Sequence, residues 1–324
     1  MEARRVVQLT LAGLALVLLS ALVLPMLGTA SISLPAAWAG RSPDREILFD
    51  VRLPRVLLSL LVGGALGVAG VICQAILRDA LATPYTLGVS SGASLGAVLA
   101  ISFRWGGVPI ASCLGAFAAV MLVVALATEG RRLSSFTLLL AGVTLNSMCF
   151  ALILFLQNVA TFGESLMIVR WLMGGIDTIE YSSLAWLTAA VLVITVWLVF
   201  HARDWNLLSI GEEWALTRGV DATRLLWAGY LAVSLLTGVV TAFTGPIGFV
   251  GLIVPHALRL KLGADHRLLL PLSFLLGAVF LALCDTAARL LISPAEIPVG
   301  VITALLGGPF FIWLLRSKRR SVWL

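Results

Sequence analysis

Residues 56–77 read VLLSLLVGGALGVAGVICQAIL, a stretch without a charged side chain. About 20 mostly apolar residues in a helix cross the roughly 30 Å hydrocarbon core of a bilayer, so this stretch predicts one membrane-spanning helix. Four glycines, Gly63, Gly64, Gly67 and Gly70, recur along it at near-helical spacing. Small residues at such a spacing let neighbouring helices approach closely, which predicts a helix in tight contact with others.

The composition of the whole chain supports a membrane protein. Of 324 residues, 60% are hydrophobic and 12% are charged, which is about half the charge of an ordinary soluble domain. Only helices and closed barrels satisfy the backbone in lipid, and the apolar stretches lack the alternation of barrel strands. We therefore predict an all-α polytopic membrane protein with about ten transmembrane helices and a single domain over residues 1–324. The predicted spans fall near residues 6–28, 56–77, 87–103, 109–128, 136–157, 184–200, 226–244, 248–262, 270–292 and 299–316.

An even number of spans places both termini on one side, and the basic residues identify that side. One face would carry Arg4, Arg5, Arg78, Arg131, Arg132, Arg203, Arg218, Arg224, Arg259, Lys261, Arg267, Arg316, Lys318, Arg319 and Arg320. The opposite face would carry Arg41, Arg45, Arg52, Arg55, Arg104, Arg170 and Arg289. Cytoplasmic loops are enriched in Lys and Arg, so the first face, with both termini, is predicted to be cytoplasmic in the cell inner membrane. The excess of basic residues on the cytoplasmic face accounts for the net charge of +6. The positive charge therefore does not indicate nucleic-acid binding.

The first apolar stretch has two interpretations. Residues 6–26 follow Arg4 and Arg5, and Gly28-Thr29-Ala30 resembles a signal-peptidase site. The apolar run is longer than the core of a usual signal peptide, and further spans follow it. We therefore expect an uncleaved first helix, with cleavage as the alternative.

Two segments interrupt the apolar pattern in corresponding parts of the chain. Residues 83–92 read TPYTLGVSSG and residues 245–251 read GPIGFVG, each at the end of a predicted span. Breaks at matching positions in two halves of opposite orientation are typical of inverted-repeat transporters. The pattern therefore predicts inverted-repeat halves.

Few ionisable residues lie within the apolar stretches, which limits how transport could be driven. Asp285 and Arg289, four residues apart on one predicted helix, are either a self-neutralising structural pair or a functional site. Proton coupling usually needs carboxylates or histidines near the bilayer midplane, so an ion-coupled carrier is disfavoured. A Walker A loop needs Gly-Lys-Ser/Thr, and neither lysine, Lys261 or Lys318, follows a glycine. Any ATPase must be a separate subunit.

The cysteines and the histidine near a span end predict no metal site. Cys73, Cys113, Cys149 and Cys284 lie in apolar stretches without a C-x-x-C motif or a histidine at ligand spacing. Packing is the expected role of each. His256, next to Pro255, is likewise expected to be structural.

Four motifs, in this order, resemble those of one transporter family. They are RLPR (52–55), LATP (81–84) with LGVSSGA (87–93), GFVGLIVPHALR (248–259) and EIPVGVITA (296–304). The chain resembles the permease subunits of binding-protein-dependent ABC importers for iron-siderophores, haem and vitamin B12. The resemblance rests on order and spacing, because any one motif alone could be an interfacial basic cluster or a close helix crossing.

The resemblance implies the fold of a type II ABC importer permease and a set of partners. Two copies of the permease would form a homodimer that encloses a path at its interface. Two ATPase subunits would lie beneath it, and one substrate-binding protein, periplasmic or a lipoprotein, would lie above. ATP and Mg would be bound by the ATPase partner, and this chain would carry no cofactor and no catalytic residue. The chain would then be a transport subunit in contact with membrane lipid, not an enzyme.

The same resemblance implies docking residues on the outer face. Arg52, Arg55 and Arg289 would receive acidic side chains from the binding protein. Charges at the rim of an interface steer encounter and fix register more than they add affinity. The alternative for Arg52 and Arg55 is anchoring to lipid headgroups.

A cytoplasmic segment, about residues 203–224, would couple the permease to its ATPase. Residues 211–219 read GEEWALTRG, a pattern typical of short amphipathic helices and of a docking surface. Gly211, Glu212, Ala215 and Gly219 match positions of the family's coupling helices, which would convert closure of the ATPase into a tilt of the spans. Arg218 stands where the family generally has leucine, so we expect an acidic residue opposite it in the ATPase.

The translocation path and its solute are less sharply defined. Asn146, Gln157 and Asn158 are polar enough to face a cavity, or they are hydrogen-bond partners between helices. The first expectation for the solute is a ferric siderophore, and cobalamin and haem are the alternatives. An ion-coupled secondary transporter and a non-transporting membrane scaffold are the alternative functions.

Overall fold

The computed structural model describes residues 3–129, 132–133 and 135–317. The predicted cytoplasmic residues Arg131, Lys318, Arg319 and Arg320 lie outside these ranges. The helices are α1 Ala3–Val23, α2 Leu34–Trp38, α3 Asp44–Glu46, α4 Leu53–Leu77, α5 Val89–Ser102, α6 Val108–Ala127, α7 Ser135–Val159, α8 Phe162–Leu172, α9 Tyr181–Phe200, α10 Ala202–Ile210, α11 Glu212–Thr217, α12 Ala222–Thr244, α13 Val250–Leu262, α14 His266–Leu290 and α15 Val299–Ser317. Two short antiparallel strands, β1 Thr128–Glu129 and β2 Arg132–Leu133, join α6 to α7.

Each predicted apolar stretch lies on a helix of the described chain. Seven helices in the described ranges are long and apolar enough to cross a membrane. The helices α5 and α13, with 14 and 13 residues, are too short to cross alone. The apolar part of α15, Val299–Leu314, also belongs to the shorter helices. The number of ten spans therefore stays a prediction.

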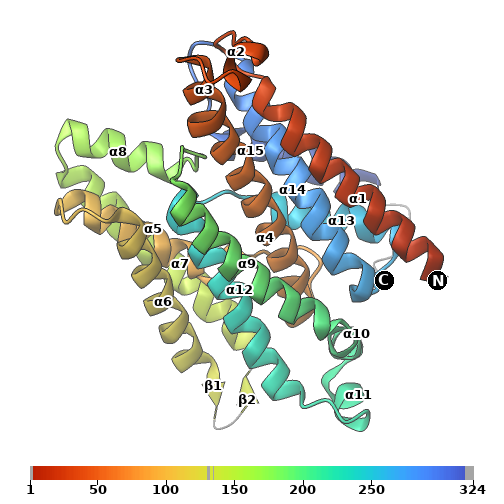
Figure 1. The fold of residues 1–324 in the computed structure, drawn as a ribbon. Coiled ribbons are helices and arrows are strands. Elements are labelled where there is room, and N and C mark those ends of the chain that lie inside the picture. Colours follow the sequence, from red (N-terminus) through yellow and green to blue (C-terminus); the bar gives the residue numbers. More distant parts are fainter. Residues whose placement is uncertain (1–2, 130–131, 134, 318–324) are drawn as a thin grey trace.

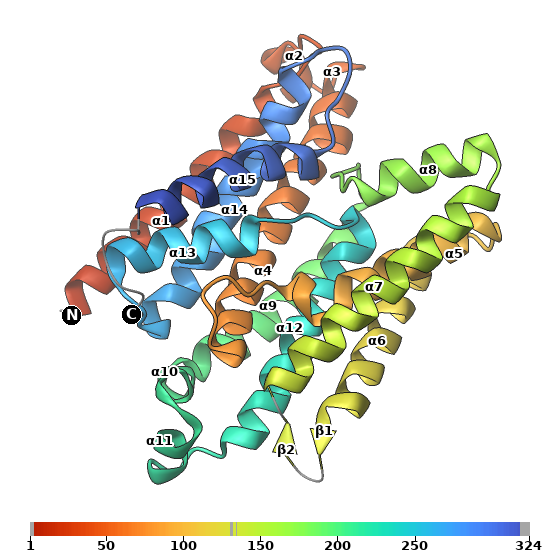
Figure 2. The same ribbon diagram turned by 180° about the vertical axis from the view of Figure 1, so that it is seen from behind.

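The molecule has two ends with different elements (Figure 1). The helices α2, α3 and α8 lie at one end, called the α8 end below, and α10, α11 and the two strands lie at the other, called the α10 end. The start of α1 and the end of α15 lie on the same side of the molecule in both views (Figures 1 and 2). An even number of crossings would place them so.

The opening stretch of the sequence forms the most enclosed helix, α4. It packs most extensively on α14 and also on α12 and α13. A Cβ atom at Gly63 would overlap the carbonyl of Gly277, and one at Gly70 would overlap the carbonyl of Gly251. Backbones therefore touch where α4 crosses α14 and α13, and the predicted close approach follows from the absence of side chains at these positions.

The two predicted breaks meet inside the molecule. A 3-10 turn, Pro84–Leu87, precedes α5, and a non-helical segment precedes α13. Each helix starts after a residue with positive φ, Gly88 at 84° and Phe249 at 69°. The Tyr85 hydroxyl donates a hydrogen bond to the carbonyl of Ile247, so the breaks are in contact. From there α5 runs toward α8 (Figure 2). The loop after α13 reaches α10, where Asp265 accepts a hydrogen bond from Asn206, so the two helices lead to opposite ends as opposed half-helices would.

One extended segment joins the two halves at the α8 end. It follows α8 and passes between the end of α12 and the start of α15. The amide of Gly175 donates to the carbonyl of Thr244 over 2.8 Å, and the amide of Gly300 donates to the carbonyl of Gly174 over 3.2 Å. This segment therefore ties the α5–α8 group to α12 and α15.

Candidate functional site

Arg52, at the α8 end, is inside the protein. Its side chain is 5% exposed. The guanidinium donates to the carbonyls of Pro25 and Met26, both over 3.4 Å, and to the carbonyl of Ala30. Charge-assisted bonds to several carbonyls satisfy a buried guanidinium. Arg52 therefore holds the chain that leaves α1 against the start of α4.

Asp285 joins two further arginines in a network below the same surface. Its carboxylate lies 3.1 Å from the Nη2 atom of Arg55 and 3.2 Å from the Nε atom of Arg289. Arg55 also reaches Glu296 over 2.9 Å, and Arg289 donates to the carbonyl of Leu27 over 3.3 Å. The predicted pairing of Asp285 with Arg289 is confirmed. Its link to Arg55 means that two guanidinium groups share the Asp285 carboxylate, and Glu296 supplies the second negative charge.

These contacts bear on the predicted docking arginines. Arg52 and Arg289 are each 5% exposed, and their donors are bonded to groups of this chain. The Arg55 side chain is 14% exposed and lies under Glu296, whose side chain is 45% exposed. An acidic side chain from a partner would therefore compete with Glu296 for Arg55. Docking by the three arginines stays a prediction.

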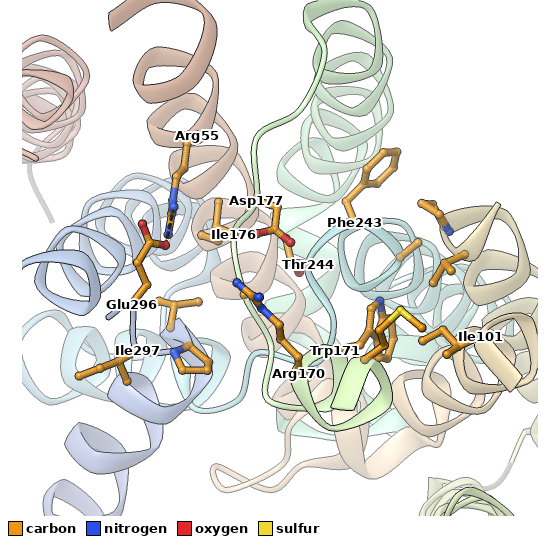
Figure 3. A pocket seen from close by; sticks show the side chains of 17 residues that line it. Arg55, Ile101, Arg170, Trp171, Ile176, Asp177, Phe243, Thr244, Glu296 and Ile297 are labelled. Carbon is orange, nitrogen blue, oxygen red and sulfur yellow. Dashed lines mark hydrogen bonds and ion pairs between the residues drawn. The ribbon is translucent and has the colours of Figure 1, made fainter. Parts of the chain in front are cut away.

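A pocket of about 370 Å³ opens beside this network (Figure 3). Arg55 and Glu296 lie on one side, Trp171 and Ile101 on the other, and Arg170 and Asp177 project between them. Its other walls include Phe243 at the end of α12. The pocket thus lies at the junction of the two halves of the chain. Sequence reasoning missed Asp177, which stands in an extended segment without a motif.

A capping box fixes α8 next to this pocket. The Thr161 hydroxyl accepts from the amide of Glu164, and the Glu164 carboxylate accepts from the amide of Thr161 over 3.0 Å. Arg104, from the turn between α5 and α6, donates to Glu164 over 2.8 Å. The hydrogen bonds from Thr161, and then that from Arg104, lower the pKa of Glu164 to about 2. The Thr-x-x-Glu pattern at 161–164 could have predicted this helix start.

The predicted coupling segment forms α10 and α11 at the opposite end. Ala215 is fully buried, whereas Gly219 lies at φ +80° in an exposed turn. Three large apolar side chains of this segment, Ile210, Trp214 and Leu216, are between 60% and 68% exposed. The predicted residue Arg218 is also exposed. This group of exposed side chains, Ile210, Trp214, Leu216 and Arg218, is called the α10–α11 surface below.

Glu212 joins this surface to the central helix. Its carboxylate lies 2.8 Å from the Nη2 atom of Arg78, the residue that ends α4 in the left-handed conformation. Both side chains are about half exposed. Because α4 also carries Arg52 and Arg55 at its other end, one buried helix connects the arginine network with the α10–α11 surface. Gly211, at the start of α11, lets the chain turn between the two short helices.

A second anchor, missed by sequence reasoning, fixes α10. The Asn206 amide donates to Asp265 over 2.9 Å, and its oxygen accepts from the amide of His266 over 2.8 Å. Trp205 is fully buried and donates from its indole to the carbonyl of Leu198 over 3.2 Å. Hydrogen bonds from Arg267 and Asn206 hold the pKa of Asp265 well below its usual range. These contacts tie α10 to α9 and α14.

A third feature is a pocket of about 530 Å³ between α5 and α7, whose mostly apolar walls carry several hydroxyl groups and one carboxamide. Asn146, one of the predicted path residues, lines it and donates to the carbonyl of Tyr85 over 2.9 Å. Gln157 and Asn158 lie at the end of α7 toward α8 and are not among its lining residues. The lining residues are Tyr85, Ser90, Ser91, Ser94, Asn146, Ser147, Phe150, Ile153 and Leu172. Sequence reasoning missed the serines, which look like ordinary small residues of a span.

Metal-ligating side chains do not gather in the part of the chain that the structure describes. No group of three or more His, Cys, Asp or Glu residues there could hold a metal ion. The four cysteines are free thiols, and Cys73, Cys149 and Cys284 are buried. His256 packs against Phe310 and Phe311, with ring centroids 6.3 Å and 5.9 Å away.

Comparison with known proteins gives concordant results. Residues 12–317 match the model of the FecCD transport family. YvrB of Bacillus subtilis, described as an uncharacterised ABC transporter permease protein, is 41% identical over 287 residues, covering 85% of this chain and 80% of that protein. The vitamin B12 import system permease protein BtuC of Escherichia coli O6:H1 is 38% identical over 313 residues, covering 95% of this chain and 94% of that protein.

Solved structures share the fold. A transporter described as of the metal-chelate ABC type, in an inward-facing conformation, is 33% identical and superposes with a TM-score of 0.85 over 96% of this chain and 99% of that one. PsaBC from Streptococcus pneumoniae, at 17% identity, superposes with a TM-score of 0.56 over 87% of this chain and 95% of that one. The second likeness concerns the fold alone.

These matches confirm several predictions from the sequence. The fold class is that of an all-helical, polytopic, type II ABC importer permease. The chain is a transport subunit and not an enzyme, and ATP is hydrolysed by a partner ATPase. The chain belongs to the FecCD transport family of binding-protein-dependent ABC importer permeases.

Proposed function

We propose that this chain forms the membrane path of an ATP-driven importer that receives a metal chelate from a binding protein and releases it in the cytoplasm. The observation that carries the proposal is the α10–α11 surface. Trp214 and Leu216 stand outside the spans and more than half exposed, on a segment anchored to α4, α9 and α14. Apolar side chains gathered at such a place are suited to a protein partner.

The orientation follows from the same assignment. The α10 end would face the cytoplasm, together with both termini and the ATPase. The α8 end, with the arginine network and its pocket, would face the binding protein. The charge distribution supports this, because Arg78, Arg203, Arg218, Arg224 and Arg267 all belong to elements of the α10 end.

We propose a second copy of this chain as the partner within the membrane. The pocket between α5 and α7 opens on a helix with large exposed apolar side chains outside the pocket, among them Leu154 and Phe155. Polar side chains gathered at membrane depth are suited to contact with another helix or with a water-filled path. A homodimer with two ATPase subunits and one binding protein would provide both.

A ferric siderophore remains the first candidate for the solute. Vitamin B12 is the second candidate, favoured by the names of relatives at 36% to 38% identity. Haem is the third. In each case the binding protein would deliver the chelate to the permease.

Reconstitution tests the proposal. The full chain would be placed in proteoliposomes with its ATPase, and ATP hydrolysis would be measured with binding proteins loaded with ferric siderophore, vitamin B12 or haem. We expect one loaded binding protein to stimulate hydrolysis several-fold. Uptake of the chelate by proteoliposomes that lack the ATPase, driven by an ion gradient, would instead establish the ion-coupled carrier.

A further inference from the structure

The pocket between α5 and α7 lies near the middle of the membrane part. Asn146 and Ser147 stand near the centre of α7, which runs from Ser135 to Val159. Ser90 and Ser94 lie one turn apart on α5, which begins at this depth and packs against α7. The two helices run side by side in both views (Figures 1 and 2). With Tyr85 and Ser91, six polar residues thus line this pocket at membrane depth.

Three of these side chains donate a hydrogen bond to a backbone carbonyl. The Ser91 hydroxyl donates to the carbonyl of Gly88 over 2.9 Å, and the Ser147 hydroxyl donates to the carbonyl of Val143 over 3.1 Å. Asn146 donates from its amide nitrogen to Tyr85. What they still offer to the pocket is mainly acceptor capacity: hydroxyl lone pairs and the Asn146 amide oxygen.

Ser90 differs from these three. It is 3% exposed and lines the pocket, and its buried hydroxyl has no hydrogen-bond partner within the described chain. Ser94, one turn further along α5, is 5% exposed and lines the same pocket. A buried hydroxyl without a partner costs free energy. The Ser90 hydroxyl is therefore free to donate or accept, beside several acceptors.

The pocket offers no full charge. Its remaining walls are Phe150, Ile153 and Leu172, and none of its lining side chains is ionised at neutral pH. An ionised group that enters membrane depth without a counter-charge is strongly disfavoured. A neutral hydroxyl or carboxamide can donate to the free acceptors and accept from Ser90 at the same time.

We propose that the Ser94–Asn146 pocket is the polar contact point of the translocation path and that it selects neutral hydroxyl- or carboxamide-bearing chelates over chelates with ionised groups. This inference rests on the proposed function, which makes the α5–α7 surface part of a path. It assigns to the permease a share of specificity that the binding protein would otherwise hold alone.

Cysteine labelling tests the pocket without knowledge of the solute. The S94C chain, in its complex with the ATPase, would be treated with neutral, anionic and cationic methanethiosulfonates, and each rate would be divided by that for a free thiol. Peptide mass analysis separates this site from the native cysteines. The control is S112C on α6, because Ser112 is fully buried, has an unpaired hydroxyl and lies outside the pocket.

We expect S94C to react with the neutral reagent at least about tenfold faster than with either charged reagent, and S112C to stay unreactive. S91C, half-buried in the same pocket, serves if S94C does not fold. Equal rates for all reagents, or no reaction at S94C and S91C, would overturn the inference. A preference for the neutral reagent, combined with a labelling rate that does not change when ATP is added, would overturn the proposed function instead. A translocation path must open and close with the ATPase, so the labelling rate should depend on ATP.

Discussion

The α8 end and the α10 end differ in which side chains they bury: the α8 end buries charged side chains, whereas the α10 end exposes charged and large apolar ones. At the α8 end Arg52, Asp285 and Arg289 are buried and satisfied by groups of the chain itself. At the α10 end the charges of Arg78 and Glu212 stand half exposed while Trp214 and Leu216 face outward. The first arrangement holds the protein together, and the second leaves a surface for another protein. The helix α4 connects the two ends, because Arg52 directly precedes its first residue and Arg78 directly follows its last.

The largest effect on stability is expected for Asp285→Asn, which tests whether the buried charges of the α8 end stabilise the fold. It would leave Arg55 and Arg289 buried without their shared carboxylate, and breaking such a buried network costs about 3–5 kcal/mol. The free energy of unfolding, measured by SDS titration in mild detergent, should fall by that amount. The matched control is Glu296→Gln, which removes a half-exposed partner of Arg55 and should cost about 1 kcal/mol or less. Equal effects of the two variants would contradict a structural α8 end.

The next test concerns the link from α4 to the α10–α11 surface. Arg78→Glu or Glu212→Arg replaces an ion pair of 2.8 Å by two like charges and should reduce the stimulation of ATP hydrolysis by a loaded binding protein several-fold. The exchange of both residues should restore it. Thermal stability should change little, because a half-exposed pair contributes about 1 kcal/mol or less.

The control for this exchange is the pair Asp221 and Arg224 on the same end. These side chains lie 3.9 Å apart within α12 and its cap, and both are largely exposed. Charge reversal there should leave stimulation unchanged. A loss of the same size at both pairs would show a general charge effect and remove the special role of Glu212.

A smaller effect concerns α8 and its dependence on pH. The pKa of Glu164 is lowered from 4.5 to about 2, so its stabilisation is fully present above pH 4.5 and is lost as the pH falls toward about 2. Hydrogen exchange should show the amides of α8 protected at neutral pH and less protected at pH 3. Glu164→Gln should show the lower protection at both values. If the variant kept the pH step, Glu164 would not be its cause.

The smallest effect concerns the start of the chain. The carbonyls of Pro25, Met26 and Ala30 accept from Arg52, and that of Leu27 accepts from Arg289. Cleavage after Ala30 would remove all four acceptors from buried guanidinium groups. The intact mass of the protein isolated from membranes should therefore include residues 1–30. A mass that lacks them would establish the signal-peptide alternative.

Local sequence patterns predicted the helices. Contacts between residues far apart in the sequence could not be predicted, because no local pattern encodes them. Apolar length predicted the helices, and i, i+4 spacing predicted the pair of Asp285 with Arg289. Arg55 meets Asp285 across 230 residues of sequence, and no periodicity shows such a pairing. Arg52 was expected at a surface because the segment that covers it, 24–30, has no pattern of its own. Ser90 could not be singled out from the sequence, since a serine in a span usually bonds to its own helix.

The most direct test of the account compares capture of partners at the two ends. A photo-cross-linking residue would replace Trp214 at the α10 end or, as the matched position, Trp38, which is 75% exposed on α2 at the α8 end. Irradiation of membranes that contain the full importer should join position 214 to the ATPase, whereas position 38 should not join to it. Capture of the ATPase at position 38, or at neither position while the complex still co-purifies, would contradict the assignment of the α10–α11 surface.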